Sequence, residues 1–228
     1  MRVVDLATTT RRELNGALHA LTSETNETLW RVENPMGQHA LACGLDAPVT
    51  VEVAGHAGYY CAGMNKQATV VVEGNAGVGV AENMMSGKVH VKGDASQSAG
   101  ATAHGGLLVI DGDASARCGI SMKGVDIVVK GSIGPMSAFM AQSGNLVVLG
   151  DAGDALGDSI YEARLFVRGA VKSLGADCVE KEMRPEHLEI LRRLLDAAGV
   201  SGVEASEFKR FGSARTLYNF HVDNAAAY

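Results

Sequence analysis

A glycine that returns every 19 residues constrains the fold of this sequence more strongly than any other feature. The series has seven members, which are Gly55, Gly74, Gly93, Gly112, Gly131, Gly150 and Gly169. Aliphatic residues stand four and two positions before each glycine, as Val51 and Val53 do in the first repeat. A fixed period of about 20 residues is typical of stacked units that share one continuous core. We therefore expect a repeat architecture rather than a helix bundle or an open sheet.

Each repeat is expected to contribute one short β-strand. Apolar residues two positions apart lie on the same face of a strand, so the aliphatic pairs predict a row of inward side chains. The glycine is expected to end the strand, because glycine can adopt the positive φ of a sharp corner. The pattern therefore predicts an all-β core, a single-stranded β-helix with seven regular turns between Val51 and Val179.

A second column of the repeat contains only small residues. The seventh residue after each repeat glycine is always Ala or Gly, and the glycines of this column are Gly100, Gly119 and Gly157. We expect the wall of the β-helix to bend close to its axis at this column, where a larger side chain would collide with the neighbouring turns.

Two amphipathic segments flank the repeats. Thr10 and Glu13 have the spacing of a capping box, and Leu14 and Leu18 recur on one face of the helix that would follow. Pro185 is expected to begin a second helix, which a leucine stripe continues and Gly199 ends. Because the exposed strand edges at the ends of a β-helix favour aggregation, we expect at least one helix to cover an end.

These patterns divide the chain into three parts. Residues 1–33 are predicted to be an N-terminal helical segment, residues 34–180 the β-helix domain, and residues 181–228 a C-terminal helix with an extended tail. The tail is rich in aromatic residues and arginine, which are common in protein interfaces. Its candidate interface residues are Phe208, Arg210, Phe211, Arg215, Tyr218 and Phe220. The tail could dock on a partner or fold over the outer wall of the β-helix. In either case, we expect the β-helix to stay folded when the residues after Gly202 are removed.

Composition excludes several classes of function. The formal net charge is −6, which argues against nucleic acid, because proteins that bind it usually carry a basic face. No apolar run is long enough to cross a membrane, and the N-terminus lacks the apolar stretch of a signal peptide, so we expect a cytoplasmic protein without a membrane partner. The four cysteines are scattered, and we expect them to be reduced.

Motifs that could carry chemistry are weak. The glycines around Gly74 lack the third glycine of a dinucleotide loop, since Glu82 stands in its place. Asn75, Asp94, Asp113 and Asp151 follow repeat glycines and are typical of corners, where they hydrogen-bond to the backbone. The histidines fall in different columns of the repeat and predict no metal site. We expect no catalytic residue, cofactor site or metal site in this chain.

The glycine pattern resembles the GXGXG domain of the glutamate synthase large subunit, over roughly Asn34 to Val179. The stretch Gly150-Asp-Ala-Gly-Asp-Ala-Leu-Gly157 is similar to the motif Gly-Asp-Ala-Asn-Asp-Tyr-Val-Gly of that family. Asn34-Pro-Met-Gly37 resembles the family's Asn-x-x-Arg-x-Val-Gly. The sequence departs from the family at Glu162-Ala163, where Gly-Gly is usual. The resemblance implies a right-handed β-helix.

The resemblance also implies a function for the chain as part of a complex. Residue 2 is Arg2 instead of the N-terminal cysteine nucleophile of glutamate synthase, and the chain has no segment resembling a flavin-binding barrel. The whole chain is most similar to the GXGXG subunit of N-methylglutamate synthase, which implies a non-catalytic structural subunit. The implied partners are an FMN-binding glutamate synthase-like subunit and a class II glutamine amidotransferase-like subunit. The resemblance implies that FMN is bound by a partner subunit, which could also hold an iron–sulfur cluster.

Three alternatives remain open at this point. The chain could be the GXGXG subunit of another complex, either glutamate synthase-like or similar to formylmethanofuran dehydrogenase, which also carries a GXGXG domain. It could be a trimeric β-helix enzyme of the acyltransferase or carbonic anhydrase type, although Tyr59 and Asn65 interrupt the six-residue aliphatic period of those proteins. It could also be a free-standing binding module.

Overall fold

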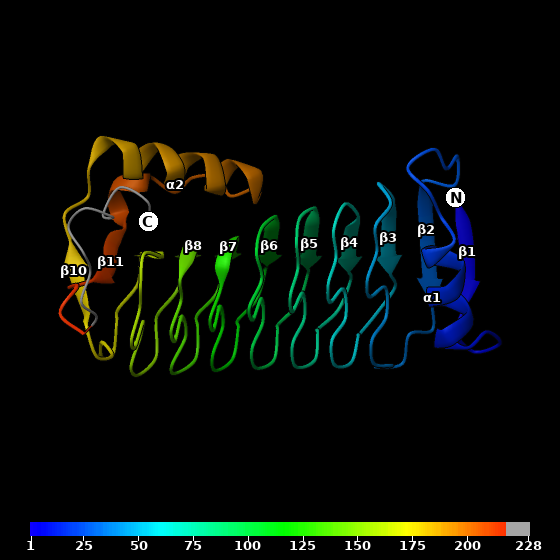
Figure 1. Ribbon diagram of the computed structural model, residues 1–228, viewed down its shortest axis with the longest axis horizontal. Helices are drawn as coiled ribbons and strands as arrows, with labels where there is room; N and C mark the ends of the chain where they lie inside the picture. The colour runs from blue at the N-terminus through cyan, green and yellow to red at the C-terminus, as the bar shows by residue number, and fades with distance from the viewer. Residues whose placement is uncertain (218–228) are drawn as a thin grey trace.

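The computed structural model describes residues 1–217, which form an elongated column of stacked turns (Figure 1). Within these residues, eleven strands form one sheet in the order β1-β2-β3-β4-β5-β6-β7-β8-β9-β11-β10. The strands are β1 (Arg2–Asp5), β2 (Leu29–Glu33), β3 (Thr50–Val53), β4 (Thr69–Val72), β5 (Lys88–Val91), β6 (Leu107–Ile110), β7 (Lys123–Val129), β8 (Ser143–Val148), β9 (Arg164–Val167), β10 (Cys178–Lys181) and β11 (Lys209–Ser213). The helices are α1 (Arg11–His19), α2 (Pro185–Ala197) and the short 3-10 helix η1 (Ala205–Glu207).

The pairing from β3 to β9 follows the 19-residue period. Val53 pairs with Val72, and Val72 pairs with Val91, in parallel strands of adjacent turns. The inward valines are fully buried and belong to one core that runs the length of the column. The predicted single-stranded β-helix with about seven turns is therefore confirmed.

The sheet extends beyond the repeats at both ends. Strand β1 pairs in parallel with β2, and β2 pairs in parallel with β3, so two strands from residues 1–33 join the sheet. At the other end β11 lies antiparallel between β9 and β10. The sheet thus continues across both predicted boundaries, at residues 33 and 180.

The physical reason for the repeat glycines differs from the one expected. Of the seven, only Gly55 has a positive φ within the left-handed region, at 146°. The others are needed because adjacent turns approach too closely for a side chain: a Cβ on Gly74 would lie 2.9 Å from the carbonyl carbon of Gly55. The expectation of a positive φ at every corner was therefore wrong, and the cause is the close approach of the preceding turn, through both its backbone and its corner side chain.

Positive φ appears instead in the column of small residues. Ala81, Gly100, Gly119 and Ala138 have φ values of 57°, 66°, 68° and 57°. Side chains with a branched Cβ strongly disfavour this left-handed region. The column ends before the last turn, because Ala176 is exposed. Larger residues such as Tyr60 and Met64 adopt the same φ at exposed positions, so smallness at this buried column reflects limited space.

Helix α1 closes the N-terminal end of the column (Figure 1). Thr10 and Glu13 form the predicted capping box, and Leu14 and Leu18 are buried in the core of the column. The Asn15 side chain donates to the carbonyl of Ala40, in the first turn, at 2.7 Å. The prediction that one helix covers an end is confirmed by α1.

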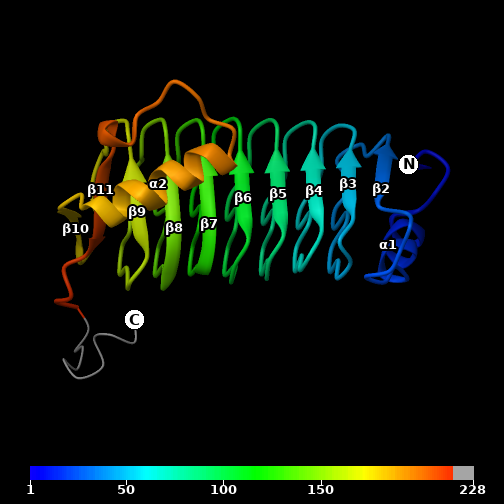
Figure 2. The ribbon, with the colours of Figure 1, turned by 90° about the horizontal axis from the view of Figure 1, so that it is seen from above.

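Helix α2 covers a face of the sheet rather than an end. It lies across the outer surface of strands β6 to β9 (Figure 2). Leu191 and Leu194 are almost fully buried against a second apolar cluster, which includes Val128, Val147 and Phe166. A helix over this face leaves the N-terminus of α2 beside the C-terminal strands, where the site described next is formed.

Candidate functional site

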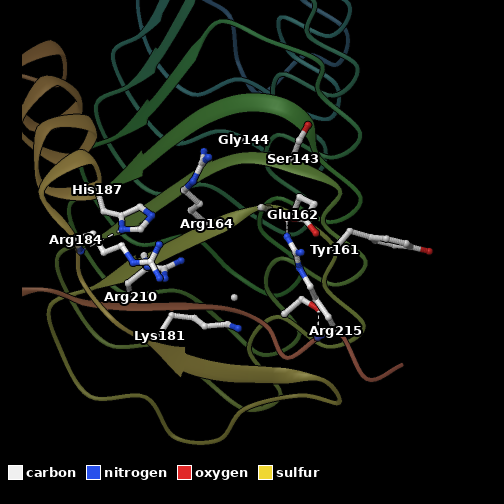
Figure 3. Close-up of a pocket in the computed structure, with 13 residues that line it drawn as sticks. Ser143, Gly144, Tyr161, Glu162, Arg164, Lys181, Arg184, His187, Arg210 and Arg215 are labelled. Atoms are coloured by element: carbon white, nitrogen blue, oxygen red, sulfur yellow. Dashed lines mark hydrogen bonds and ion pairs between the residues drawn. The ribbon is translucent and has the colours of Figure 1, made fainter. Parts of the chain in front are cut away.

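A pocket with a volume of about 560 Å³ lies at the C-terminal end of the column. We call it the C-terminal pocket, and Figure 3 shows the side chains that line it. They come from the start of β8, the start of β9 and the turn before it, β10, the start of α2, and β11 with the residues after it. The lining residues are Ser143, Gly144, Tyr161, Glu162, Ala163, Arg164, Lys181, Arg184, His187, Arg210, Gly212, Ser213 and Arg215.

Strand register brings the basic side chains together. Arg210 of β11 pairs with Phe166 of β9 on one side and with Lys181 of β10 on the other. Paired residues present their side chains on the same face of a sheet, and residues two apart on one strand do so as well. Arg164, two residues before Phe166, therefore shares a face with Arg210 and Lys181. This is the face that α2 covers.

The charge in the pocket is strongly unbalanced. Arg164, Lys181, Arg184, Arg210 and Arg215 line it, and within residues 1–217 the only carboxylate in the lining is that of Glu162. Glu162 pairs with Arg215, at 2.8 Å between Oε2 and Nη2. Arg184 pairs with the exposed Glu182, outside the lining, at 3.3 Å. Arg210 donates its Nε–H to the Glu182 carbonyl at 2.9 Å.

Two groups in the pocket, Arg210 and His187, have a lowered pKa. Burial, followed by repulsion from Arg164 and Arg184, lowers the pKa of Arg210. Burial, followed by the charge of Arg210, lowers the pKa of His187. His187 Nδ1 accepts the backbone N–H of Arg184 at 3.2 Å, so the proton of the neutral ring lies on Nε2. Both shifts indicate a site in which another positive charge is unfavourable.

The predicted interface residues fall into three groups. Phe208 and Phe211 are each only 4% exposed and lie in the apolar clusters of this chain, so their rings contact their own chain instead of being presented to a partner. Arg210 and Arg215 line the C-terminal pocket and remain candidates for an interaction. Tyr218 and Phe220 lie outside the described residues.

The cysteines are unsuited to nucleophilic chemistry. All four, at positions 43, 61, 118 and 178, are free thiols, in agreement with the expectation of reduced cysteines. Burial raises the pKa of Cys118 and of Cys178 to about 12, and raises that of Cys61 even further. A thiol must ionise to attack an electrophile, so these groups stay unreactive near neutral pH.

Other polar groups form pairs without converging on a common centre. His90 Nε2 and Lys130 Nζ both contact Asp111 Oδ1, at 2.9 and 2.8 Å. In the part of the chain that the structure describes, no group of three or more His, Cys, Asp or Glu residues is placed to hold a metal ion. No helix of residues 1–217 has the length and apolar character needed to cross a membrane.

The C-terminal pocket was not predicted from the sequence. Its arginines are far apart along the chain, and they meet only because β11 inserts between β9 and β10. One pattern in the strand sequences could have indicated the position of the pocket. The residue three before each repeat glycine is polar or variable in the early turns but apolar in the last four, at Val109, Val128, Val147 and Phe166. That change marks where α2 packs and hence where the pocket lies.

Comparisons with known proteins give the family of the chain. No family model matches the sequence. Protein GlxC of Rhizobium meliloti (strain 1021) is 68% identical over 228 residues, which is the full length of both proteins. The fold is similar to a chain in the crystal structure of the formyltransferase/hydrolase complex (FhcABCD) from Methylorubrum extorquens in complex with methylofuran. The TM-score is 0.65 at 25% identity, over 88% of this chain and 85% of that one. At 68% identity over its whole length, the chain belongs to the family of Protein GlxC.

Proposed function

We propose that the chain is a non-catalytic structural subunit of a heteromeric glutamate synthase-like flavoenzyme. The observation that carries the role of a subunit is the match of nearly the whole fold, over 88% of the chain, to one chain of a multi-subunit complex. The glutamate synthase-like character of the complex is proposed from the resemblance of the glycine repeat to the GXGXG domain. A likeness confined to a few turns would support only a shared repeat. Here the match includes most of the column, so we propose that the column itself is the functional part.

The column has the physical properties that a scaffold requires. Every pair of adjacent strands from β3 to β9 is hydrogen-bonded in parallel, with one register shift between Lys123 and Asp126 of β7, so the turns cannot slide independently. A repeat structure of this kind keeps a constant spacing along its length and presents extended surfaces. Within residues 1–217, helix α2 covers the outer sheet face over β6 to β9 (Figure 2). We propose that another molecule docks on the face of β2 to β5.

The reaction that we assign to the complex is the exchange of an amino group. Methylamine and L-glutamate would give N-methyl-L-glutamate and ammonia, as in N-methylglutamate synthase. FMN would be held by a barrel subunit, and an amidotransferase-like subunit would be the third component. In this arrangement the present chain supplies no reacting group. It keeps the two other active sites at a fixed separation.

The test is purification of the chain, with an affinity tag, from the cell that makes it. We expect an FMN-binding subunit and an amidotransferase-like subunit to copurify in fixed stoichiometry, and we expect the complex to form N-methylglutamate. The chain produced alone should be colourless and inactive toward glutamate, glutamine and methylamine. A stoichiometric flavin spectrum from the isolated chain, or turnover without partners, would contradict the proposal.

A second candidate function follows from the structural similarity. The matched chain comes from a formyltransferase/hydrolase complex, so the present chain could serve as the corresponding subunit of a formyl-transferring assembly. The same purification distinguishes the two. Partners that bind FMN favour the amino-group-transferring complex, whereas partners with formyltransferase and hydrolase activity favour the second candidate. A trimer of the chain alone, as in the β-helix acyltransferases, would contradict both.

A further inference from the structure

The C-terminal pocket holds more positive charge than the chain itself neutralises. Within residues 1–217, Arg164 and Lys181 have no carboxylate partner, while Arg210 uses only its Nε–H on a backbone carbonyl. The whole chain has an excess of acidic residues, 26 against 20 Lys and Arg. Arg184 and Arg215 each pair with a carboxylate. In the described part of the chain Arg164, Lys181 and Arg210 do not, although Glu182 and Glu186, outside the lining, offset part of the charge of Arg210.

Part of this cluster is also desolvated. Arg164, Lys181 and Arg210 are only partly exposed, beside the buried His187, and burial is the main cause of the lowered pKa of Arg210. The N-terminus of α2 adds about half a positive charge to the same place. Like charges held together in a partly dry pocket repel one another, and a bound anion would remove that repulsion.

We infer that the C-terminal pocket binds a small molecule that carries two oxyanion groups, either carboxylates or phosphates. One group would lie near Arg210, within reach of the charges of Arg164 and Arg184. In Figure 3 the guanidinium group of Arg164 extends toward Gly144. The second would lie toward Lys181, whose amino group projects into the middle of the pocket (Figure 3). This binding needs no other subunit, so the inference does not depend on the proposed function.

The chemistry of the lining favours this class of ligand. A guanidinium presents a planar fork of N–H donors that matches the two oxygens of a carboxylate or phosphate. The volume of about 560 Å³ is within the range of small-molecule sites and exceeds what a single carboxylate requires. Lys181 adds a second cationic contact beside Arg210, its partner across the strands, so a ligand with two anionic groups would satisfy both.

The test is calorimetric titration of the full-length isolated chain at low ionic strength. Glutarate represents the dicarboxylates, pyrophosphate represents ligands with two phosphate groups, and glutaramide is the uncharged analogue of glutarate. We expect saturable binding of at least one of the two anions at millimolar concentration or below, no binding of glutaramide, and weaker binding as salt is added. The relative affinities of glutarate and pyrophosphate identify which oxyanion the site prefers.

Matched variants locate the site. Arg164→Gln is expected to weaken binding by about tenfold or more, because it removes charge-assisted hydrogen bonds. Lys181→Gln, at the proposed position of the second anionic group, should weaken glutarate binding as well. Arg192→Gln removes the same charge from an exposed position on α2, outside the lining, and should leave binding unchanged. If neither anion binds the wild-type chain, or if Arg192→Gln weakens binding as much as Arg164→Gln does, the inference is wrong.

Discussion

The Oδ1 atom of Asp94 accepts the backbone N–H of Asp113, one turn along the column, at 2.8 Å. The same contact recurs from turn to turn, with distances of 2.7 to 3.0 Å. The side chains that accept in this ladder are His56, Asn75, Asp94, Asp113, Ser132 and Asp151. Each one occupies the space in which the next repeat glycine would carry a Cβ. The ladder and the glycine series are therefore one feature.

Substitution of Gly112 by alanine tests this coupling. A Cβ at Gly112 would overlap Asp94 Oδ1 and would lie 3.0 Å from the carbonyl group of Gly93. We expect Gly112→Ala to lower the free energy of unfolding by about 1–3 kcal/mol, since overpacking in a tight site has costs of that size. Urea unfolding of the variant and the wild type measures the difference.

Gly16 offers a matched control for Gly112→Ala. It lies on the exposed side of α1, and a Cβ there would meet nothing within 4 Å. Alanine favours a helix interior over glycine by roughly 0.5–1 kcal/mol, so Gly16→Ala should raise the stability slightly. Equal changes in the free energy of unfolding for the two substitutions would show that the turns leave room for a side chain at Gly112.

The β-helix could be predicted because its contacts repeat. Each turn meets the next through the same residues, so one local pattern recurs in the sequence seven times, and the pairing of Val53 with Val72 follows directly. The corner residues Asp94 and Asp113 were expected to bond to backbone N–H groups, and they do. The partner lies one turn away along the column rather than within the same corner, because the turns stack in register.

The C-terminal end could not be predicted in the same way, because its contacts occur once. The leucines of α2 show that the helix has an apolar stripe, yet they do not show which apolar surface it covers. Strand β11 is short and shows no clear alternation in sequence, and its antiparallel insertion depends on both β9 and β10. The C-terminal pocket is formed by α2 and β11 together, so it could not be predicted from the sequence for the same reason.

The column of small residues gives a graded prediction at Gly119. Its φ is 68°, and Ala81 and Ala138 adopt the same conformation in other turns, so Gly119→Ala should cost little. Gly119→Val should destabilise the protein by about 1–3 kcal/mol or more, because a β-branched residue disfavours this region and the core is close. Thermal unfolding measures the difference in unfolding temperature between the two variants, with Lys123→Ala at an exposed position as a control. Equal midpoints for Gly119→Val and Lys123→Ala would contradict it.

Asp177 is expected to make the C-terminal segment sensitive to acid. Although desolvation raises the pKa of its carboxyl group, hydrogen bonds from Ser213, Thr216 and the Leu217 backbone lower the pKa to about 2. Because the folded pKa lies below the unfolded value of 3.8, the stabilisation is present above pH 3.8 and is lost as the pH falls toward 2.

Hydrogen exchange can detect the role of Asp177. The amides of Thr216 and Leu217 donate to its carboxylate, at 2.8 and 3.2 Å, and should exchange faster in Asp177→Ala than in the wild type. The exposed Asp196 provides a control, since Asp196→Ala should leave these amides unchanged. Wild-type protection should fall toward the level of Asp177→Ala as the pH is lowered through the folded pKa, after correction for intrinsic exchange. Equal protection in Asp177→Ala and the wild type at neutral pH would show that other contacts hold the segment.

Removal of the chain after Gly202 should disrupt the C-terminal end of the column, contrary to the expectation from sequence that the core would stay folded without an arm. The deletion removes β11, which pairs with β9 and β10, together with the buried rings of Phe208 and Phe211. Loss of one buried phenylalanine ring typically costs about 3–5 kcal/mol, and the uncovered β9 becomes an edge that favours association. We expect a lower unfolding temperature and larger species in size-exclusion chromatography. Deletion of residues 218–228 alone keeps every contact described for β11 and serves as the control. If the chain ending at Gly202 is monomeric and unfolds at the temperature of this control, β11 does not stabilise the column.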